Sequence, residues 1–168
     1  IENEIEYLKC DYNIKGITLI DEIAIPLNPK EAIVHLEAFA RTGIVWRGQC
    51  RVNGLTLEIA KLARESGCVA LGLGVESVSQ TSLDMMNKKI NISEVKQTIS
   101  LLKKKDIEVR VFLIMGLPAE PEDIVKQTWE FIEETAPDLV FLSLLTVRPG
   151  TIIYNNPKKF GIKHVNTD

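Results

Sequence analysis

A carboxylate and an amine frame a short segment that follows one apolar run of the chain. The run Cys68-Val69-Ala70-Leu71-Gly72-Leu73 has the composition of a buried strand, and Gly74-Val75-Glu76-Ser77 comes directly after it. Ser79 predicts a helix N-cap, and Lys88 lies beyond that helix. Parallel sheets bind ligands at the rim formed by the carboxyl ends of the strands, where the chain continues into the next helix. Glu76 and Lys88 therefore predict a charged ligand site at such a rim.

Apolar runs alternate with helical patterns along the whole chain. We expect strands at residues 16–20, 44–52, 68–73, 109–116 and 139–147, and helices at residues 1–11, 29–41, 55–66, 79–86, 93–105 and 121–135. Near-continuous apolar strands are typical of a parallel sheet covered on both faces. Right-handed crossovers then allow a doubly wound sheet or part of a (β/α) barrel. The fold class is α/β with about five parallel strands, followed by a polar, irregular tail at residues 155–168.

The ends of the other expected strands bring further charges to the same rim. Asp21-Glu22 ends the first strand, Arg51 lies near the end of the second, and Gly116 ends the fourth. For any one of Asp21, Arg51 and Glu76, a salt-bridged collar that closes the sheet explains the charge as well as a ligand does. For the set together we favour a ligand site, because paired charges in a cleft are typical of functional sites.

Glycine, sulfur and aromatic residues have simpler structural interpretations. Gly74 and Gly116 would let a ligand approach the backbone closely, although a tight turn explains either one alone. Neither lies in a GxGxxG or GxxxxGK[ST] pattern, so the sequence predicts no dinucleotide or P-loop phosphate motif. We expect core packing for the residues Trp46, Cys68, Met85, Met86 and Trp129.

Composition excludes several classes of protein. The net charge is −3, and Lys and Arg are spread along the chain, so we expect no nucleic-acid partner. No apolar stretch reaches the roughly 18–20 residues of a membrane span, and no signal peptide is visible, so the expected location is the cytoplasm. Cys10, Cys50 and Cys68 are too few and too distant for a disulfide framework. His35 and His164 lack the spacing of zinc ligands.

The order of the strand ends resembles that of radical S-adenosylmethionine (SAM) proteins over residues 1–154. The matching segments, in chain order, are Glu4-Ile5-Glu6-Tyr7-Leu8, Thr18-Leu19-Ile20-Asp21-Glu22, Trp46 with Arg51-Val52-Asn53, Gly74 to Gln80 with Leu83 and Asn87-Lys88, Gly116-Leu117-Pro118-Ala119-Glu120, and Pro149-Gly150-Thr151 with Tyr154. The nearest branch is the cobalamin-binding one, of the anaerobic magnesium-protoporphyrin monomethyl ester cyclase type. Ala119 departs from the GLPGE turn of many relatives.

The resemblance implies a partial (β/α) barrel of which this chain holds the second to sixth strands. In that family, three cysteines of a CxxxCxxC motif hold a 4Fe–4S cluster, and one electron cleaves SAM to methionine and a deoxyadenosyl radical. The radical serves hydrogen abstraction or methyl and ring-forming chemistry. This chain has no CxxxCxxC. We therefore expect the cluster ligands before Ile1, and an inactive fragment when residues 1–168 stand alone.

The resemblance also implies partners. These are a small-molecule substrate and an electron donor such as flavodoxin or ferredoxin, and a cobalamin domain before this segment is left open. A missing first strand would leave one sheet edge without a neighbour, which invites self-association.

The family's SAM-binding positions carry over to this sequence residue by residue. Glu76 would accept a hydrogen bond from a SAM hydroxyl, and Lys88 would meet the SAM carboxylate as a point charge. Arg51 would meet that carboxylate or the substrate. The remaining implied contacts are Asp21 and Glu22 with the SAM ammonium or substrate, Gly74 and Ser77 beside Glu76, and Ile114, Gly116 and Val147 around the adenine.

Two other interpretations remain open. The first is a complete, cluster-free domain that binds SAM or a nucleotide and performs no radical chemistry. The second is an unrelated flavodoxin-like interaction or phosphate-binding module, in which the spacing of Glu76 and Lys88 would be a coincidence. The radical SAM interpretation requires Glu76, Lys88 and Arg51 to converge on one cleft.

Overall fold

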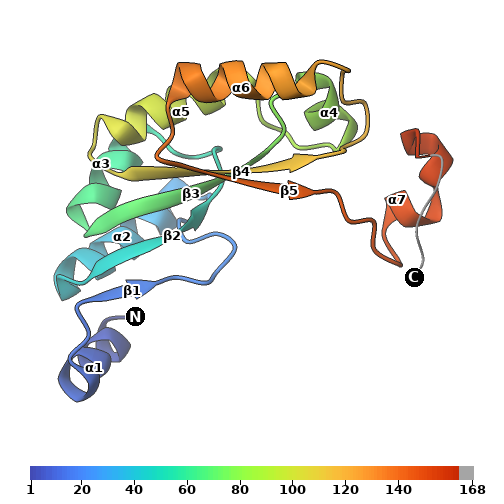
Figure 1. The fold of residues 1–168 in the computed structure, drawn as a ribbon. Coiled ribbons are helices and arrows are strands. Elements are labelled where there is room, and N and C mark those ends of the chain that lie inside the picture. Colours follow the sequence, from blue (N-terminus) through green and yellow to red (C-terminus); the bar gives the residue numbers. More distant parts are fainter. Residues whose placement is uncertain (163–168) are drawn as a thin grey trace.

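Five parallel strands form one curled sheet in the computed structural model, which describes residues 1–162 (Figure 1). The strands are β1 (Gly16–Thr18), β2 (Val45–Cys50), β3 (Cys68–Glu76), β4 (Glu108–Met115) and β5 (Leu139–Leu144), and each lies beside its neighbour in the chain. A doubly wound sheet reverses its strand order, whereas this one does not. The sheet is therefore part of a (β/α) barrel, which decides between the two predicted topologies.

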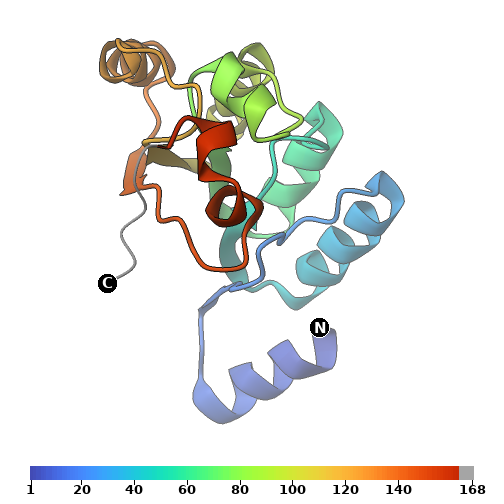
Figure 2. The same cartoon turned by 90° about the vertical axis from the view of Figure 1, so that its right-hand side faces the viewer.

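Helices cover only one side of this sheet. The helices of the chain are α1 (Glu2–Tyr12), α2 (Pro29–Thr42), α3 (Leu57–Glu65), α4 (Gln80–Met85), α5 (Ile92–Lys103), α6 (Ile124–Thr135) and α7 (Ile152–Asn155), followed by a 3₁₀ turn at Pro157–Phe160. Of these, α7 and the 3₁₀ turn lie beyond the carboxyl end of β5 rather than on the sheet (Figure 1). Figure 2 views the strands from their carboxyl ends and shows α2, α3, α5 and α6 as an arc around the sheet. The expectation of a sheet covered on both faces is wrong, since the concave face is open. The 3₁₀ turn at Pro157–Phe160 lies within the tail that we predicted to be irregular from residue 155 onward.

The helix boundaries follow the capping residues that the sequence contains. Asn28 accepts a hydrogen bond from the backbone of Lys30 at 3.0 Å, and Pro29 opens α2. Gly43 ends that helix with φ of 62°, a conformation that glycine adopts without strain. Ser79 caps α4 by accepting from the backbone N–H of Ser82 at 3.4 Å. These predicted starts and stops are confirmed.

The core lies between the convex face of the sheet and the helices. Trp46 is wholly buried, its ring stacks on Phe39 with centroids 5.2 Å apart, and its Nε1 donates to the Ser66 carbonyl at 3.0 Å. Cys68 is buried there as predicted. Trp129 and Met85 are not, because their side chains are 62% and 48% exposed. The spacing of apolar residues predicts that these segments are helical, but it does not predict which face of each helix packs against the sheet.

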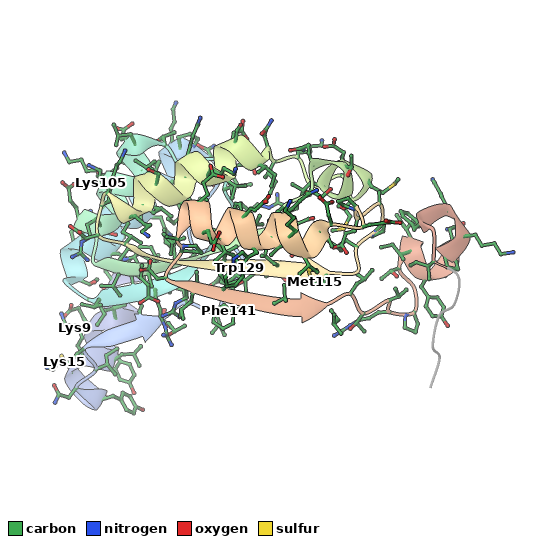
Figure 3. All side chains as sticks on the ribbon, turned by 45° about the horizontal axis from the view of Figure 1, so that its top comes forward. Lys9, Lys15, Lys105, Met115, Trp129 and Phe141 are labelled. Atoms are coloured by element: carbon green, nitrogen blue, oxygen red, sulfur yellow. The ribbon has the colours of Figure 1, made fainter. Side chains whose placement is uncertain are left out.

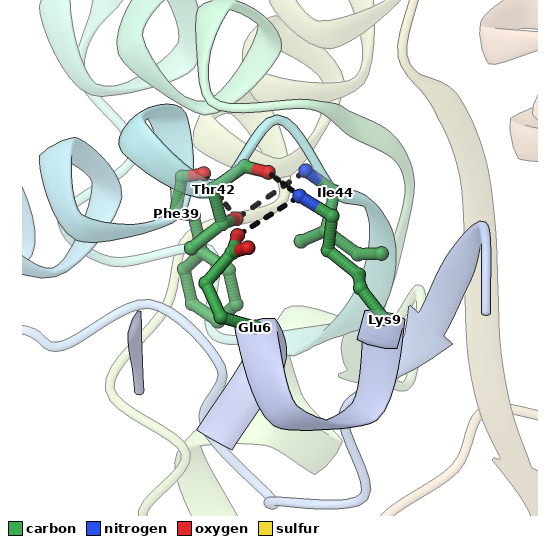
Figure 4. Close-up of polar contacts among 5 residues, drawn as sticks. All are labelled: Glu6, Lys9, Phe39, Thr42 and Ile44. Atoms are coloured by element: carbon green, nitrogen blue, oxygen red, sulfur yellow. Dashed lines mark hydrogen bonds and ion pairs between the residues drawn. The ribbon is translucent and has the colours of Figure 1, made fainter. Parts of the chain in front are cut away.

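Helix α1 is held against α2 by polar contacts, shown in Figure 4. Lys9 Nζ donates to the Thr42 carbonyl at 2.8 Å and to Glu6 Oε1 at 2.9 Å. The Thr42 hydroxyl donates to the Phe39 carbonyl and accepts from the backbone N–H of Ile44. One lysine thus satisfies a carbonyl that the end of α2 leaves without a helical partner.

We expect Gly67, which lies in the turn between α3 and β3, to be hard to replace. Its φ is 93°, and a Cβ added there would overlap the backbone oxygen of Ile44. Gly43 is the matched control, because its φ is also positive but nothing lies within 4 Å of its Cβ position. Gly43→Ala should cost about 1–2 kcal/mol for the left-handed backbone, and Gly67→Ala at least about 2 kcal/mol more. Urea denaturation measures both, and equal losses would contradict the overlap.

Candidate functional site

Strand β3 ends in an irregular step that folds Glu76 back over the strand. Gly74 pairs with Phe112 on β4, yet Glu76 pairs with Leu113, so two residues of β3 advance against one of β4. Such a β-bulge bends the strand locally. The backbone N–H of Ser77 donates to the Val75 carbonyl at 2.9 Å, which closes a three-residue turn around Glu76. Glu76 has φ of 69°, a strained conformation for a residue with a side chain.

The folded-back Glu76 forms an ion pair with Lys88. Lys88 Nζ donates to Glu76 Oε1 at 2.8 Å, and the two side chains are 21% and 22% exposed. Lys88 is positioned by its backbone N–H, which donates to the Leu83 carbonyl at 2.8 Å after α4. The predicted juxtaposition of the carboxylate and the amine is therefore present.

Gly74 leaves the space that this ion pair occupies. A Cβ at Gly74 would lie 3.1 Å from Glu76 Oε1 and 3.6 Å from Lys88 Nζ. Gly74, Lys88 and Arg51 line one pocket of about 360 Å³, whose other walls include Leu27. That volume lies within the range of small-molecule sites. The Glu76–Lys88 ion pair is overall neutral, so Arg51 and Lys89 leave the pocket with a net positive charge.

A hydrogen bond closes the side of this pocket. Asn53 Nδ2 donates to the Lys89 carbonyl at 2.9 Å, and both residues line the pocket. The segment after β2 and the segment after α4 are thereby joined. Arg51 and Lys88 line this pocket together, whereas Glu76 is not among its lining residues and is joined to it through the ion pair with Lys88. The convergence of all three residues on one ligand stays a prediction.

A second turn lies at the end of β4, beside the first. Gly116 has φ of 84°, and its N–H donates to Glu120 Oε2 at 2.8 Å. Ala119 has φ of 60°, a backbone conformation that glycine adopts with less strain than alanine. The other oxygen of Glu120 is buried without a hydrogen-bond partner among the described residues. The sequence motif contains Glu120, but the sequence does not predict that the Glu120 carboxylate holds the turn through its hydrogen bond with Gly116.

The remaining predicted ligand residues lie outside the Gly74 pocket. Ile114 is half-buried on β4 opposite Ser143, and Val147 follows β5, which ends at Leu144 rather than at 147 as predicted. Gly116 is exposed at its turn. Their assignment to an adenine site stays a prediction.

Asp21, Glu22 and Ser77 are also separate from that pocket. Asp21 and Glu22 are exposed after β1, and Asp21 lines a different pocket of about 470 Å³ beside α1. Ser77 is buried, and its Oγ accepts from the backbone N–H of Ser79 at 3.1 Å. This contact gives Ser77 a structural role in the turn, and its ligand role stays a prediction.

The cysteines do not form a metal centre within residues 1–162. No group of three or more His, Cys, Asp or Glu side chains able to hold a metal ion occurs there. Cys10 is exposed, whereas Cys50 and Cys68 are buried. Burial raises the pKa of the Cys68 thiol to about 12 and that of Cys50 further, so both stay protonated at neutral pH. His164 lies outside the described residues. No described helix is both long and apolar enough to cross a membrane.

Comparison with known sequences agrees with this geometry. The family model described as the radical SAM superfamily matches residues 1–132. The chain is 31% identical over 146 residues to a bacteriochlorophyllide d C-12(1)-methyltransferase of Chlorobaculum tepidum, covering 86% of this chain and 32% of that protein. It is 29% identical over 160 residues to an anaerobic magnesium-protoporphyrin IX monomethyl ester cyclase of Cereibacter sphaeroides, covering 92% and 26%. The chain thus spans about a third or less of these relatives.

Solved structures show the same fold. The radical SAM methyltransferase TsrM from Kitasatospora setae, with cobalamin and a [4Fe-4S] cluster bound, matches with a TM-score of 0.78 at 17% identity, covering 89% of this chain and 31% of TsrM. The cobalamin-dependent SAM radical enzyme OxsB, with aqua-cobalamin and SAM bound, matches with a TM-score of 0.68 at 18% identity, covering 94% and 25%. The partial barrel is therefore shared with cobalamin-dependent radical SAM proteins.

The strain at Glu76 can be measured by comparing two substitutions. Glu76→Ala and Glu76→Gly both remove the carboxylate that pairs with Lys88, but only glycine relaxes the positive φ. We expect the glycine variant to be about 1 kcal/mol more stable than the alanine variant. Glu130 within α6 is the control, where glycine should be about 1 kcal/mol less stable than alanine. The same order at both positions in urea denaturation would refute the strain.

Proposed function

Because the chain belongs to the radical SAM superfamily, we propose that residues 1–154 form the SAM-binding part of a radical SAM iron–sulfur oxidoreductase or transferase. One observation carries this proposal. The Glu76–Lys88 ion pair, held in place by a bulge and by the empty space at Gly74, opens onto a pocket that Arg51 also lines. The site thus offers acceptor and donor groups for a zwitterionic ligand.

The paired residues still have capacity for a ligand. An ammonium group has three donors, and Lys88 uses one of them on Glu76. Within residues 1–162 its other hydrogens and the Arg51 guanidinium have no hydrogen-bond partner, so we propose that they hold the SAM carboxylate. Glu76 uses Oε1 for Lys88, which leaves Oε2 to accept a SAM hydroxyl. Further proposed contacts are those of Asp21, Glu22, Gly74, Ser77, Ile114, Gly116 and Val147.

The described residues fit SAM but do not fit an iron–sulfur cluster, since no three cysteines meet. We therefore place the cluster ligands outside residues 1–168 and expect this chain alone to be inactive. When held at a reduced cluster, SAM supplies a carbon radical for hydrogen abstraction. What residues 51, 74, 76 and 88 contribute is binding and orientation.

Substrate and partners are inferred from the relatives. Similar proteins act on bacteriochlorophyllide d or on magnesium-protoporphyrin IX monomethyl ester, and we propose a small-molecule substrate here as well. The reductive chemistry requires an electron donor, for which flavodoxin or ferredoxin is suitable. Cobalamin is proposed as a further cofactor on the basis of the TsrM and OxsB structures.

Replacing Lys88 should weaken SAM binding without unfolding the protein. Lys88→Met removes one charge-assisted hydrogen bond, so we expect the dissociation constant for SAM to rise about ten-fold or more in isothermal titration calorimetry. Gly74→Ala should also raise the dissociation constant for SAM, because the added Cβ crowds the Glu76–Lys88 ion pair. Lys61→Met on α3, which removes the same charge from a surface pair with Glu65, is the control. Unchanged affinity in Lys88→Met would refute the site.

Cluster reconstitution tests the second half of the proposal. Residues 1–168, treated anaerobically with iron, sulfide and reductant, should acquire no cluster absorbance and release no 5′-deoxyadenosine from SAM. If they bind SAM in the absence of iron, the pocket functions independently of the cluster. Formation of 5′-deoxyadenosine by this chain alone would contradict the assignment of the cluster ligands.

A further inference from the structure

The outer edge of β5 has no neighbouring strand within residues 1–162. β5 is the last strand in the order of the sheet, and it pairs there with β4 alone. Because the backbone groups of successive residues point to opposite sides of a strand, half of the N–H and C=O groups of β5 point away from β4. A strand edge of this kind is a template for pairing with another strand.

The convex side of this edge exposes apolar side chains on two elements. Leu142 pairs with the buried Leu113 of β4, so its side chain lies on the convex side of the sheet, as does that of Leu144 two residues later. The two leucines are 59% and 78% exposed. On α6, Val125 and Trp129 are 69% and 62% exposed. We call these four side chains the edge strip.

The apolar side of α6 faces this edge because the opposite side of α6 meets α5. Lys96 Nζ on α5 donates to Glu134 Oε2 on α6 at 2.5 Å. With 3.6 residues per turn, Val125 and Trp129 lie on the side of α6 away from Glu134. Figure 2 shows α6 as the last helix of the arc around the sheet. Phe141 extends from β5 on the side away from α6 and Trp129 (Figure 3).

The edge strip is complementary to itself. A closed dimer of identical chains has a two-fold axis, which makes two neighbouring β5 strands antiparallel. Directly opposite side chains then share a face, and a pairing centred on Leu142 sets Val140 beside the partner's Leu144. Every convex side chain of β5 thereby gains an apolar neighbour. A pairing centred on Phe141 would instead set Leu144 opposite the partner's Asp138.

Charges on α6 are complementary in the same arrangement. Lys126 and Glu133 are exposed and lie on either side of Trp129 along the helix. Lys126 reaches Glu130 of its own helix only at 3.7 Å. Antiparallel copies of α6 that meet at Trp129 set each Lys126 beside the partner's Glu133.

The helix also supplies area that the strand lacks. A strand of six residues is only about 20 Å long, so its edge alone falls short of the roughly 800 Å² per partner of a stable interface. α6 has 12 residues and is about 18 Å long, so it extends the contact over a similar length.

We propose that two copies of this chain form a dimer through β5 and α6, with one continuous sheet across the interface. The partner is thus a second copy of the chain. Because the joined strands run in opposite directions, the carboxyl rims of the two sheets point to opposite ends of the dimer. The interface uses none of the residues that line the Gly74 pocket, so this inference is independent of the proposed function.

Sedimentation velocity of residues 1–168 should show a dimer that dissociates on dilution. Leu142→Glu sets two like charges opposite each other and should raise the dimer dissociation constant about ten-fold or more. Leu142→Lys should do the same, and mixing the two variants should restore the dimer because each glutamate then faces a lysine. Val34→Glu on α2, where Val34 is 65% exposed, is the matched control and should leave the dimer unchanged.

Trp129 fluorescence gives a second measurement. Its emission should shift to shorter wavelength as the dimer forms, whereas Trp46 is already wholly buried. SAM should bind Leu142→Glu and the wild-type chain equally, so that failure of the SAM site and failure of the interface are distinguishable.

Three results would overturn the proposal. The first is a wild-type chain that stays monomeric at every concentration. The second is a dimer that survives Leu142→Glu or that Val34→Glu weakens equally, since the interface would then lie elsewhere or the charge effect would be nonspecific. The third is a mixture of Leu142→Glu and Leu142→Lys that stays monomeric, because position 142 would then not face its own copy.

Discussion

The placement of the charged side chains at the rim of this sheet depends on the strained conformation of Glu76 at the end of β3. A regular strand would carry Glu76 away from Gly74 at about 3.3 Å per residue. The bulge and the three-residue turn instead fold its carboxylate back, where Lys88 meets it at 2.8 Å. A non-glycine residue at positive φ costs about 1–3 kcal/mol and persists only where its surroundings fix it. Val75, which is fully buried, and the pairing of Glu76 with Leu113 provide that constraint.

The two faces of β3 have different roles: one packs in the core, and the other lies on the side of the proposed ligand site. Leu71, Leu73 and Val75 face the helices and are fully buried, so this side anchors the strand through apolar packing. Gly72 and Gly74 face the concave side, where the Phe112 ring and the Glu76–Lys88 ion pair occupy the space that side chains would fill. Changes in the concave residues can therefore alter ligand chemistry while the packed side continues to hold the sheet.

Sequence reasoning found the elements because their signals are local. Apolar runs, the caps Asn28 and Ser79, and the stop at Gly43 each act within a few residues. The ion pair at the rim was also predictable, because strand ends of a parallel sheet share one edge. The bulge after Gly74 was not, since its cause is the pairing with β4, and β3 was predicted to end at Leu73. Apolar runs do not predict the arginines of the concave face, because the strands that contain Arg47 and Arg110 alternate apolar and polar side chains instead of being continuously apolar.

The edge that exposes most apolar surface is β5, whereas sequence reasoning expected an exposed edge before the first strand. β1 has three residues, and α1, held by Lys9, lies on that side of the sheet. β5 has six residues, and Phe141, Leu142 and Leu144 expose 46%, 59% and 78% of their surfaces. No charged side chain interrupts β5, and charges are what natural edges use against unwanted pairing. Within the described residues the apolar edge without a neighbouring strand is therefore that of β5, beside the stacked rings of Phe112 and Phe141, and self-association stays a prediction.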